Sequence, residues 1–339
     1  MPVRAFELKD YGLNNLVLVS RQDQAPGPDE VLVNVHAISL NYRDLSTIEG
    51  RYRRNLTLPA VLVADCAGTI QEVGANVDDI SQGNRIMTQF MPDWIDGPFQ
   101  DEYQLTTLGS PGPGVAAEQV ILSKRAVLPM PNNYSFAEAS TLPIAGLTAW
   151  SSLVTAGPLK GKTVVVLGTG GVSIFGLQLA KAMGANVVVT SKSNKKLARA
   201  CELGADLAIN YLEDPNWHRS IRKFTNGVGA DLILEAGGSG TLPNSIKAVR
   251  SGGVIALFGV LTGGVGEIET RALLARRISI VGIFVDSRRS FENLVEFLTT
   301  HDIRPVIGAE FPFEQLPDAL RLMQAAEHFG KIVINGPTG

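Results

Sequence analysis

Three glycines, Gly168, Gly170 and Gly171, have the spacing and the setting of a phosphate-binding turn. They follow the apolar run TVVVLG and precede a stretch with helical periodicity. In this setting the first glycine permits a tight turn, the second lets the backbone approach a pyrophosphate, and the helix offers free N–H groups. Ser173 stands where the full fingerprint has a third glycine, which packs the helix against the strand. The pattern predicts a dinucleotide site, and an ordinary strand–helix turn is the alternative.

The end of the next strand indicates which nucleotide would be bound. NAD-binding proteins place an acid there, about 20 residues after the first glycine, to bond the ribose hydroxyls. Here Ser191 occupies that place, and Lys192, Lys195 and Lys196 follow. An acid would repel a 2′-phosphate, whereas a serine with lysines would bind one through charge-assisted hydrogen bonds. The sequence favours NADP(H) over NAD(H), with a solvated, lysine-rich helix start as the alternative.

A dense polar run follows the strand-like segment VLVNVHAISL and supplies the candidate catalytic groups. Asn41 can donate a hydrogen bond to a substrate carbonyl, and Tyr42 or Tyr52 can donate a hydrogen bond or a proton. Arg43 and Asp44 are adjacent and are expected to pair. A bound water is an alternative proton source. A further segment, residues 91–114, is rich in Pro and Gly and carries aromatic residues, which predicts either a pocket wall or lid, or a plain surface loop.

Length and composition restrict the class of protein. The chain has 339 residues, of which 45% are hydrophobic and 19% charged, and its net charge is −3. These values are typical of a globular protein of about two domains. The net charge gives no indication of a nucleic-acid or membrane partner. No apolar run is long enough to cross a bilayer. The two cysteines cannot form a disulfide framework, and with no apparent signal peptide we expect a cytoplasmic protein.

The order of the expected elements indicates a split domain organisation. The first part alternates like half-buried strands and is punctuated by Gly, Pro and Asn. From Thr163 onward strands and helices alternate, which predicts an α/β fold with a parallel sheet covered on both faces. The tail returns to mixed structure. We therefore predict a dinucleotide-binding domain at residues 146–284, inserted into a β-rich domain formed by residues 1–145 and 285–339.

Several motifs in the right order give the chain a resemblance to a known family over nearly its whole length. They are NYRDL, PAVLVADCAG, GNRI, TLPIAGLTAW, VLGTGGVSIFGLQLAKAMGA, LGAD with INY, and HFGKIVI. The chain resembles the medium-chain dehydrogenase/reductase superfamily, and within it the zinc-less, quinone-oxidoreductase-like and alcohol dehydrogenase-like members. The resemblance implies a Rossmann domain, doubly wound around a parallel sheet, together with a β-rich, GroES-like catalytic domain.

The resemblance also bears on zinc. Zinc-dependent members carry Cys, His and Cys at the positions of Asn41, Ala64 and about Ile144. An amide and two aliphatic side chains cannot build the nitrogen and sulfur shell that zinc needs. The cysteine-rich structural zinc lobe of those members has no counterpart either, and Cys66 is expected to be a small buried residue. We therefore expect no zinc.

Further cofactor contacts follow only from the resemblance. It places Val172 and Thr148 beside the nicotinamide ring. It implies that Tyr211 and Lys196 bind the 2′-phosphate, and it places Lys331 near the pyrophosphate. The segments LFGV and VGIF would meet the carboxamide through the four residues Gly259, Val260, Ile283 and Phe284.

The activity implied is the NADPH-dependent reduction of a carbon–carbon double bond conjugated to a carbonyl, or of a quinone, both small-molecule substrates. A zinc-independent, NAD(P)-linked alcohol or carbonyl dehydrogenase is the second reading, and a cofactor-binding protein without turnover is the third. Family members commonly dimerise through an edge strand of the cofactor domain. The apolar segment RRISIVGIF suits such an edge, so we expect a homodimer.

Overall fold

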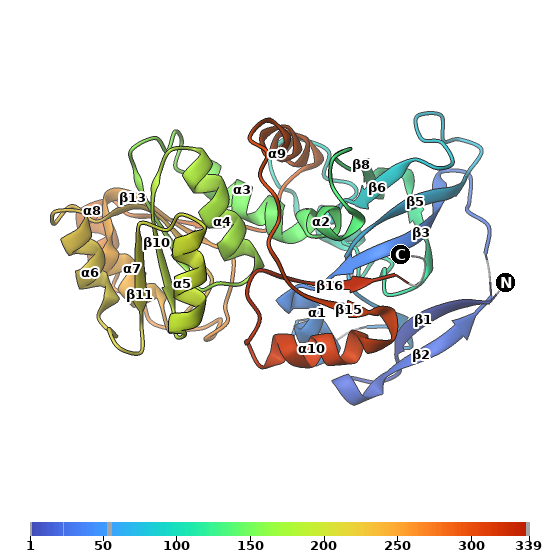
Figure 1. Cartoon of the computed structure of the whole chain (residues 1–339), viewed down its shortest axis with the longest axis horizontal. Coiled ribbons are helices and arrows are strands. Elements are labelled where there is room, and N and C mark those ends of the chain that lie inside the picture. Colours follow the sequence, from blue (N-terminus) through green and yellow to red (C-terminus); the bar gives the residue numbers. More distant parts are fainter. Residues whose placement is uncertain (1, 23, 53–55, 337–339) are drawn as a thin grey trace. The chain divides into compact units, whose positions relative to one another are not determined.

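The structure, a computed structural model, describes residues 2–22, 24–52 and 56–336 (Figure 1). The chain divides into two compact units. Unit 1 comprises residues 1–145, 286–299 and 304–339, and unit 2 comprises residues 146–285 and 300–303. Among the described residues, none of the helices combines the length and the apolar character needed to cross a membrane.

Unit 2 contains a six-stranded sheet in the part of the chain described, and every neighbouring pair of strands is parallel. The strand order is β11-β10-β9-β12-β13-β14. The chain crosses first to one side of β9 and later to the other, so the order reverses between β9 and β12, and in such sheets ligands bind beyond the carboxyl ends of the strands at that point. The α/β prediction is confirmed. The bounds are β9 Thr163–Leu167, β10 Asn186–Ser191, β11 Leu207–Asn210, β12 Ala230–Glu235, β13 Val249–Leu257 and β14 Ser279–Gly282.

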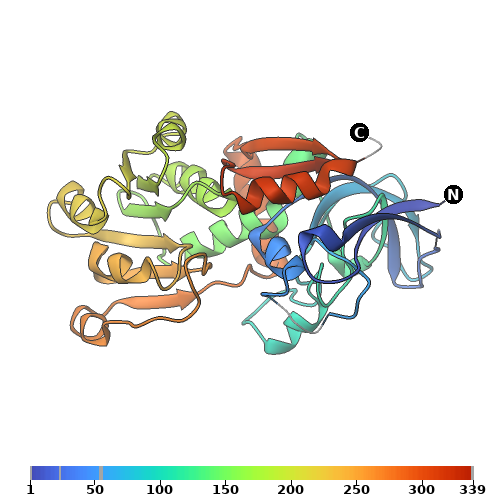
Figure 2. The ribbon, with the colours of Figure 1, turned by 90° about the horizontal axis from the view of Figure 1, so that it is seen from below.

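Helices cover both faces of this sheet (Figure 2). Gly176 on α4 faces the side chains of Val166 and Leu234, whereas Val165 and Ile233 point to the opposite face, where they join a buried cluster with Trp217 and Ile246 of α6 and α7. Strand side chains alternate in direction, so a valine-rich strand such as β9 serves both faces. The helices of unit 2 are α3 Leu147–Val154, α4 Gly171–Ala182, α5 Asn194–Glu202, α6 Trp217–Phe224, α7 Leu242–Ala248 and α8 Thr270–Arg276.

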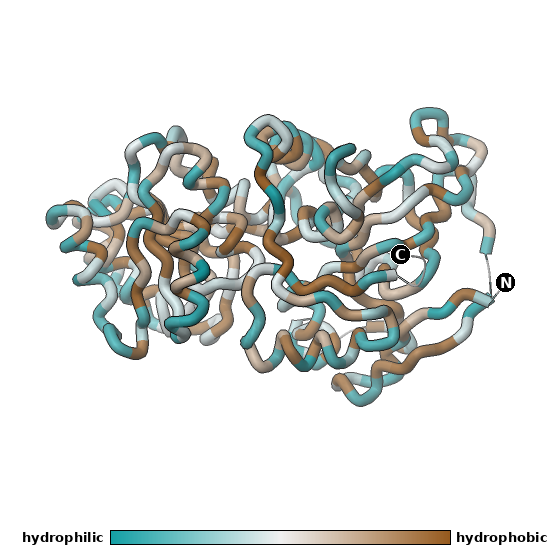
Figure 3. Tube along the Cα trace, in the orientation of Figure 1, coloured by the Kyte–Doolittle hydropathy of each residue, from teal (hydrophilic) through white to brown (hydrophobic). Residues whose placement is uncertain are grey.

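Unit 1 is built mainly from strands. Its described residues form a seven-stranded sheet, in the order β15-β16-β3-β5-β6-β8 with β7 also paired to β3, and a three-stranded sheet in the order β2-β1-β4. Apolar strand residues make up the interior of both units (Figure 3). The strands are β1 Val3–Leu8, β2 Leu16–Arg21, β3 Glu30–Ser39, β4 Ala60–Val61, β5 Asp65–Val73, β6 Arg85–Thr88, β7 Gln119–Ser123, β8 Val127–Pro129, β15 Ile307–Pro312 and β16 Lys331–Asn335.

One pairing in unit 1 joins distant parts of the sequence. β16, near the end of the chain, runs antiparallel to β3, with Val333 opposite Ser39. This register brings the first residue of β16, Lys331, beside the polar run that follows β3. The helices of unit 1 are α1 Tyr42–Ile48, α2 Phe136–Ser140, α9 Arg288–Thr300 and α10 Leu316–Gln324, with a π-helical turn at Leu142–Gly146 and 3-10 turns at Leu13–Asn15, Asp101–Thr106, Lys124–Ala126 and Phe313–Gln315.

Candidate functional site

The glycine turn of unit 2 has the geometry of a phosphate cradle. Gly168 adopts φ +82°, a left-handed conformation that favours glycine, and its N–H donates to the Thr190 carbonyl at 2.9 Å. Gly170 precedes α4 in an extended conformation, and Gly171 and Val172 begin that helix. A twelve-residue helix therefore begins shortly after β9, and its N-terminus lies at the carboxyl end of that strand. Free N–H groups and the positive end of the helix dipole can receive an anion there.

The tight contact between this helix and the sheet lies one turn later than the fingerprint suggests. A Cβ on Gly176 would lie 2.5 Å from Leu234 Cδ2, so a larger residue here would force the Leu234 side chain to shift. Ser173, at the fingerprint position, is buried and donates its hydroxyl to the Leu167 carbonyl at 2.8 Å. The serine thus anchors the helix start to the end of β9. Sequence reasoning missed Gly176, although an Ile-Phe-Gly-Leu run within a helix is an available signal.

The residues predicted for the 2′-phosphate come together at the ends of β10 and β11. The Tyr211 N–H donates to the Ser191 carbonyl at 3.1 Å, so the two residues are neighbours across the strands. The Ser191 hydroxyl accepts from Ser193 N–H at 3.3 Å, and the Ser193 hydroxyl in turn accepts from Lys196 N–H at 3.4 Å at the start of α5. Partial burial raises the pKa of Tyr211, so its phenol stays protonated and able to donate.

An acidic side chain that sequence reasoning overlooked lies close to this group. Glu213 accepts from the Asn194 amide at 2.8 Å and from the Asn210 amide at 2.9 Å. The two amides hold the carboxylate at the side of the α5 start. The α5 start therefore has a carboxylate near it as well as lysines. This negative charge reduces the expected preference for a 2′-phosphate.

The remaining predicted cofactor residues of unit 2 lie on three different segments. Thr148 is buried in α3, and its carbonyl accepts from the Ser152 hydroxyl. Gly259 and Val260 follow β13, and the Val260 side chain is 57% exposed. Ile283, which with Phe284 follows β14, is tied to β13 by a bond from its N–H to the Leu257 carbonyl at 2.9 Å. The ends of β13 and β14 are therefore adjacent, and their contact with a carboxamide stays a prediction.

Lys331 belongs to unit 1, and its predicted place near the pyrophosphate stays a prediction. The side chain is buried, with 2% of the residue exposed. Its Nζ donates to the Leu40 carbonyl and to Asn41 Oδ1, both at 2.7 Å. The physical reason is the antiparallel register of β16 on β3, which points this lysine at the end of β3. The ammonium is therefore part of a buried polar cluster.

The buried polar cluster centres on Asn41 and Asp65. Asn41 Nδ2 donates to Asp65 Oδ2 at 2.8 Å, and the same oxygen accepts from Ile144 N–H at 3.2 Å. Asp65 is fully buried, and its second oxygen, Oδ1, has no hydrogen-bond partner among the described residues. The Asn41 amide oxygen accepts from Lys331 and its nitrogen donates to Asp65, so Asn41 links these two buried charged residues. One N–H of Nδ2 remains for a substrate carbonyl.

Arg43 and Asp44 pair as expected and extend the cluster outward. Arg43 Nη1 lies 3.3 Å from Asp44 Oδ1, and Asp44 Oδ2 accepts from Asn41 N–H at 2.8 Å. The Arg43 guanidinium also donates to the Leu108 carbonyl and lies over the Tyr52 ring, 5.1 Å from its centroid. Arg43 therefore ties the start of α1 to the 91–114 segment and to Tyr52.

The two candidate phenols are open to solvent. Tyr42 is 40% exposed, and its hydroxyl accepts from Arg51 at 3.3 Å. Tyr52 is 38% exposed. Asn41 and Tyr42 thus lie at the N-terminal end of α1, and Tyr52 follows the helix and lies under the Arg43 guanidinium; the amide is buried and the phenols are exposed. Their catalytic roles stay predictions.

The 91–114 segment is ordered by its own aromatic residues. Trp94 stacks on Tyr103 with ring centroids 5.9 Å apart, and Phe99 meets Trp94 edge-on at 5.2 Å. The Trp94 indole donates to the Gly97 carbonyl at 2.9 Å. These rings contact one another, so they form a small core within the segment. The predicted roles of the segment, a pocket wall or lid on one hand and a plain surface loop on the other, stay predictions.

Burial shifts the pKa values of the cluster. It raises the pKa of Asp65 to about 7, against the opposing effect of the Lys331 charge. It lowers the pKa of Lys331 to about 8, and the carboxylates of Asp65 and Asp44 oppose that shift. The pKa of Asp44 is raised for the same reason, while Arg43 counteracts the rise. The cluster can therefore hold or release a proton near neutral pH.

The raised pKa of Asp65 makes a prediction about stability. The folded chain binds this proton more tightly than the unfolded chain, whose aspartate has a pKa of 3.8, so the stabilisation is lost as pH rises toward about 7. Asp65→Asn cannot ionise. Between pH 5 and pH 7 the unmodified protein should lose more unfolding free energy than the variant, by at most about 1.4 kcal/mol per pH unit. Urea unfolding of both proteins at these pH values measures the difference, and parallel curves would contradict the shift.

The residues of the cluster do not fit a zinc ion. Asn41 is engaged by Lys331 and Asp65, and the side chains of Ala64 and Ile144 carry no donor atoms. The Lys331 ammonium, which donates to Asn41 Oδ1 at 2.7 Å, would also repel a metal cation beside Asn41. The described residues also contain no group of three or more His, Cys, Asp or Glu side chains placed to hold a metal.

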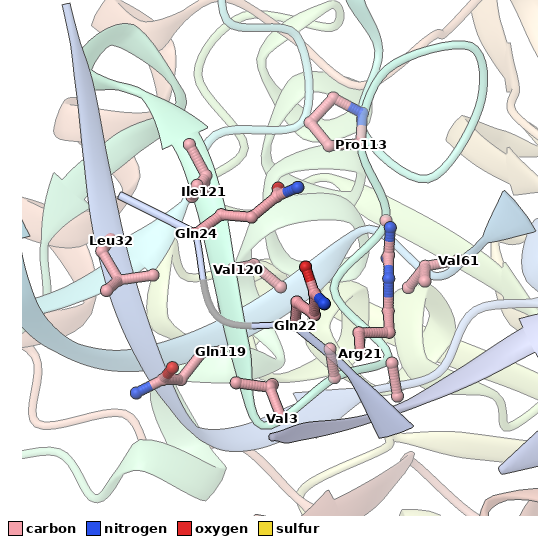
Figure 4. Close-up of a pocket in the computed structure, with 13 residues that line it drawn as sticks. Val3, Arg21, Gln22, Gln24, Leu32, Val61, Pro113, Gln119, Val120 and Ile121 are labelled. Atoms are coloured by element: carbon pink, nitrogen blue, oxygen red, sulfur yellow. The ribbon is translucent and has the colours of Figure 1, made fainter. Parts of the chain in front are cut away.

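A cavity of about 300 Å³ lies elsewhere in unit 1 (Figure 4). Its lining includes no residue predicted for catalysis or cofactor binding. Polar side chains and aliphatic side chains both face it. The residues that define it are Val3, Arg21, Gln22, Gln24, Leu32, Val61, Gln119 and Ile121, with five others from the same strands and loops.

Comparison with known proteins establishes the family. The chain matches the alcohol dehydrogenase GroES-like domain family over residues 27–132 and the zinc-binding dehydrogenase family over residues 171–300. A zinc-type alcohol dehydrogenase-like protein of Schizosaccharomyces pombe is 40% identical over 323 residues, which cover 92% of each chain. The 2-methylene-furan-3-one reductase of Solanum lycopersicum is 30% identical, over 98% of this chain and 79% of that protein.

A solved structure agrees with the sequence matches. The crystal structure of an NAD-dependent alcohol dehydrogenase superimposes with a TM-score of 0.89 at 32% identity, and it covers 98% of this chain and 99% of the other. The protein therefore belongs to the medium-chain dehydrogenase/reductase superfamily and is an oxidoreductase of that superfamily. The predicted combination of a Rossmann sheet with a GroES-like domain is confirmed.

Proposed function

We propose that the protein is a zinc-independent, NADPH-dependent reductase of activated double bonds, of the enone or quinone type. The observation that carries the proposal is the buried cluster of Asn41, Asp65 and Lys331, which supplies hydrogen bonds and a fixed ammonium where zinc-dependent relatives would need metal ligands. The similarity to a 2-methylene-furan-3-one reductase supports a reductase of this type. The bound NADPH would supply a hydride.

The chain's own residues would have separate tasks. In unit 2 the glycine turn would receive the pyrophosphate, while Ser191, Lys196 and Tyr211 would bind the 2′-phosphate. In unit 1 the free N–H of Asn41, or the phenol of Tyr42 or Tyr52, would donate to the substrate oxygen as negative charge develops there. Hydride addition to the β-carbon would leave an enolate, and either phenol, or a water, would protonate that enolate.

The direct test is turnover with a panel of substrates. Purified protein with NADPH should reduce enones or quinones and should not reduce simple aldehydes at a comparable rate. Elemental analysis should find no stoichiometric zinc, and incubation with a chelator should leave the rate unchanged. One tightly bound zinc per chain, or turnover that a chelator abolishes, would refute the proposal.

The alternative function is that of an NAD(P)-dependent alcohol or carbonyl dehydrogenase that works without zinc. The similarity to an NAD-dependent alcohol dehydrogenase of known structure, at 32% identity, favours this reading. The same panel separates the two functions: oxidation of alcohols with NAD, and no reduction of enones, would select the dehydrogenase. Binding of a nicotinamide cofactor without turnover of any panel member would select a non-catalytic role.

We also propose that two chains pair through β14, in a reducing compartment such as the cytoplasm. β14 ends the order of the six-stranded sheet, so one of its edges is available to another strand. Apolar side chains of the neighbouring segment are exposed, among them Leu274 at 83% and Val265 at 94%. Burial of such a patch in an interface would remove it from water. Both cysteines, Cys66 and Cys201, are free.

This pairing predicts a dimer mass in solution. Light scattering at micromolar protein should give twice the chain mass of 36.2 kDa. Val281→Lys would place a charge on the edge strand and should shift the protein toward monomer. Ala208→Lys, on β11 at the opposite edge of the same sheet, is the matched control and should leave the dimer intact. A monomer mass for the unmodified protein would exclude the interface.

A further inference from the structure

A buried carboxylate at the end of β12 has no part in the proposed chemistry. Glu235 is fully buried. Its Oε1 accepts from Gly237 N–H at 2.7 Å, from Gly238 N–H at 3.2 Å and from the Thr241 hydroxyl at 2.5 Å. Its Oε2 accepts from the Ser245 hydroxyl. Four donors thus converge on one side chain, and all four belong to the segment that directly follows the strand.

Burying an ionised carboxylate is unfavourable unless hydrogen bonds compensate for the lost hydration. Each of the four bonds is charge-assisted and is therefore stronger than a neutral one. The loop can satisfy the carboxylate in this way only if both glycine N–H groups turn back toward β12. Glu235 therefore selects one conformation of a glycine-rich loop, residues 236–241, which we call the first loop. Without Glu235, the glycines would allow this loop many conformations.

The first loop is in turn bonded to a second loop, residues 258–263, that follows β13. Thr262 is the main link: its N–H donates to the Gly237 carbonyl at 2.7 Å, and its hydroxyl donates to the same carbonyl at 2.8 Å. The Thr262 hydroxyl also accepts from Gly240 N–H at 2.9 Å. A second link joins Ser239 N–H to the Gly263 carbonyl at 3.0 Å.

The two loops approach too closely to tolerate side chains at the contact. A Cβ on Gly238 would lie 2.4 Å from the Gly263 carbonyl oxygen, and a Cβ on Gly259 would lie 2.5 Å from that of Ala236. The conformation of the second loop therefore depends on that of the first. Gly259 and Val260, predicted to meet the nicotinamide carboxamide, lie on the second loop. The chain of contacts thus runs from Glu235 through Thr262 to a predicted cofactor contact.

We infer that Glu235 is a positioning residue that fixes both loops in one conformation, and that this conformation sets the affinity for the nicotinamide end of the cofactor. The second clause rests on the proposed function, whereas the first concerns the free protein. The hydrogen bonds of the Glu235 side chain reach neither the residues proposed for the 2′-phosphate nor those proposed for catalysis. Its loss should therefore weaken the binding of the whole cofactor and spare the binding of an adenosine fragment.

The experiment compares three variants in the free protein and with ligands. Glu235→Gln removes the charge with little change of shape. Thr262→Val removes the two hydrogen bonds of the exposed hydroxyl between the loops, leaves the backbone bonds and keeps Glu235 intact, so it remains informative if Glu235→Gln unfolds. Ser251→Ala, an exposed hydroxyl at the other end of β13, is the matched control. Hydrogen exchange by mass spectrometry reports loop opening, and titrations with NADPH and with adenosine 2′,5′-bisphosphate report binding.

We expect faster exchange in both loops for Glu235→Gln and Thr262→Val, with no change for Ser251→Ala. Loss of one to two hydrogen bonds corresponds to about threefold to tenfold weaker NADPH binding for Thr262→Val and about tenfold or more for Glu235→Gln. The bisphosphate affinity should stay within about twofold, as a change of a few tenths of a kcal/mol implies.

Unchanged exchange in the two loops of the folded variants would overturn the inference, as would equal weakening of NADPH and of the bisphosphate. If the unmodified protein bound neither ligand, the proposed function would fail together with the cofactor clause. The exchange rates would still decide separately whether Glu235 fixes the loops.

Discussion

Replacing Ser191 with aspartate should reverse the cofactor preference of this protein. The unmodified chain should bind NADPH about tenfold to a hundredfold more tightly than NADH, because a charge-assisted contact to the 2′-phosphate contributes roughly 1.5–3 kcal/mol. In Ser191→Asp a carboxylate at the end of β10 repels that phosphate and accepts from the ribose hydroxyls of NADH. Ser191 already accepts from Ser193 N–H, so an aspartate can keep this bond. Fluorescence titration with both cofactors measures the ratio.

Two lysine variants and the salt concentration serve as controls for this change of cofactor preference. Lys196→Ala should weaken NADPH binding and leave NADH binding nearly unchanged, whereas Lys223→Ala, on the exposed side of α6, should alter neither. Rising salt should reduce the NADPH advantage because exposed charges are screened. Equal affinities for the two cofactors in the unmodified protein, or tighter NADH, would show that the end of β10 has been misread.

Removing the buried ammonium of Lys331 should strongly destabilise the fold. Lys331→Met leaves the Leu40 carbonyl and Asn41 Oδ1 without their donor, and it removes the positive charge that balances Asp65 and Asp44. Breaking a buried charge arrangement by deleting one partner destabilises proteins by about 3–5 kcal/mol. Chemical denaturation at pH 7 should show a loss of this size in the free energy of unfolding.

A surface lysine of the same chain provides the matched control. Lys181 forms an ion pair with Asp206 at 2.8 Å, but the two side chains are 30% and 33% exposed. Exposed pairs contribute roughly 0–1 kcal/mol, so Lys181→Met should change the unfolding free energy by no more than that. Similar losses for the two variants would contradict the role assigned to burial. Lys331→Met can also be made in the Asp65→Asn variant. If it lowers the free energy of unfolding there as much as in the unmodified protein, the Asp65 charge is not what the lysine balances.

The local elements of the dinucleotide unit follow from the sequence because short-range rules fix them. The valine-rich runs around Gly168 predicted parallel strands, since strands buried on both faces are apolar throughout. The turn after β9 needed glycine, and Gly168 has the left-handed conformation that such a turn requires. Ser191 was likewise assigned from its place at the end of a predicted strand, whereas Tyr211 was assigned only from the family resemblance.

The surroundings of the functional residues depended on long-range pairing, which no local pattern encodes. Lys331 is separated from Asn41 by 290 positions, and only the register of β16 on β3 places its ammonium among buried acceptors. The resemblance placed this lysine near the pyrophosphate but gave no sign of its burial. Glu235 was passed over for the same reason, because three of its four donors come from the loop that follows β12 and the fourth, Ser245, lies in α7. Sequence by itself determined the types of element and predicted the kind of cofactor site, while tertiary pairing decided which charged groups are buried and therefore what they can do.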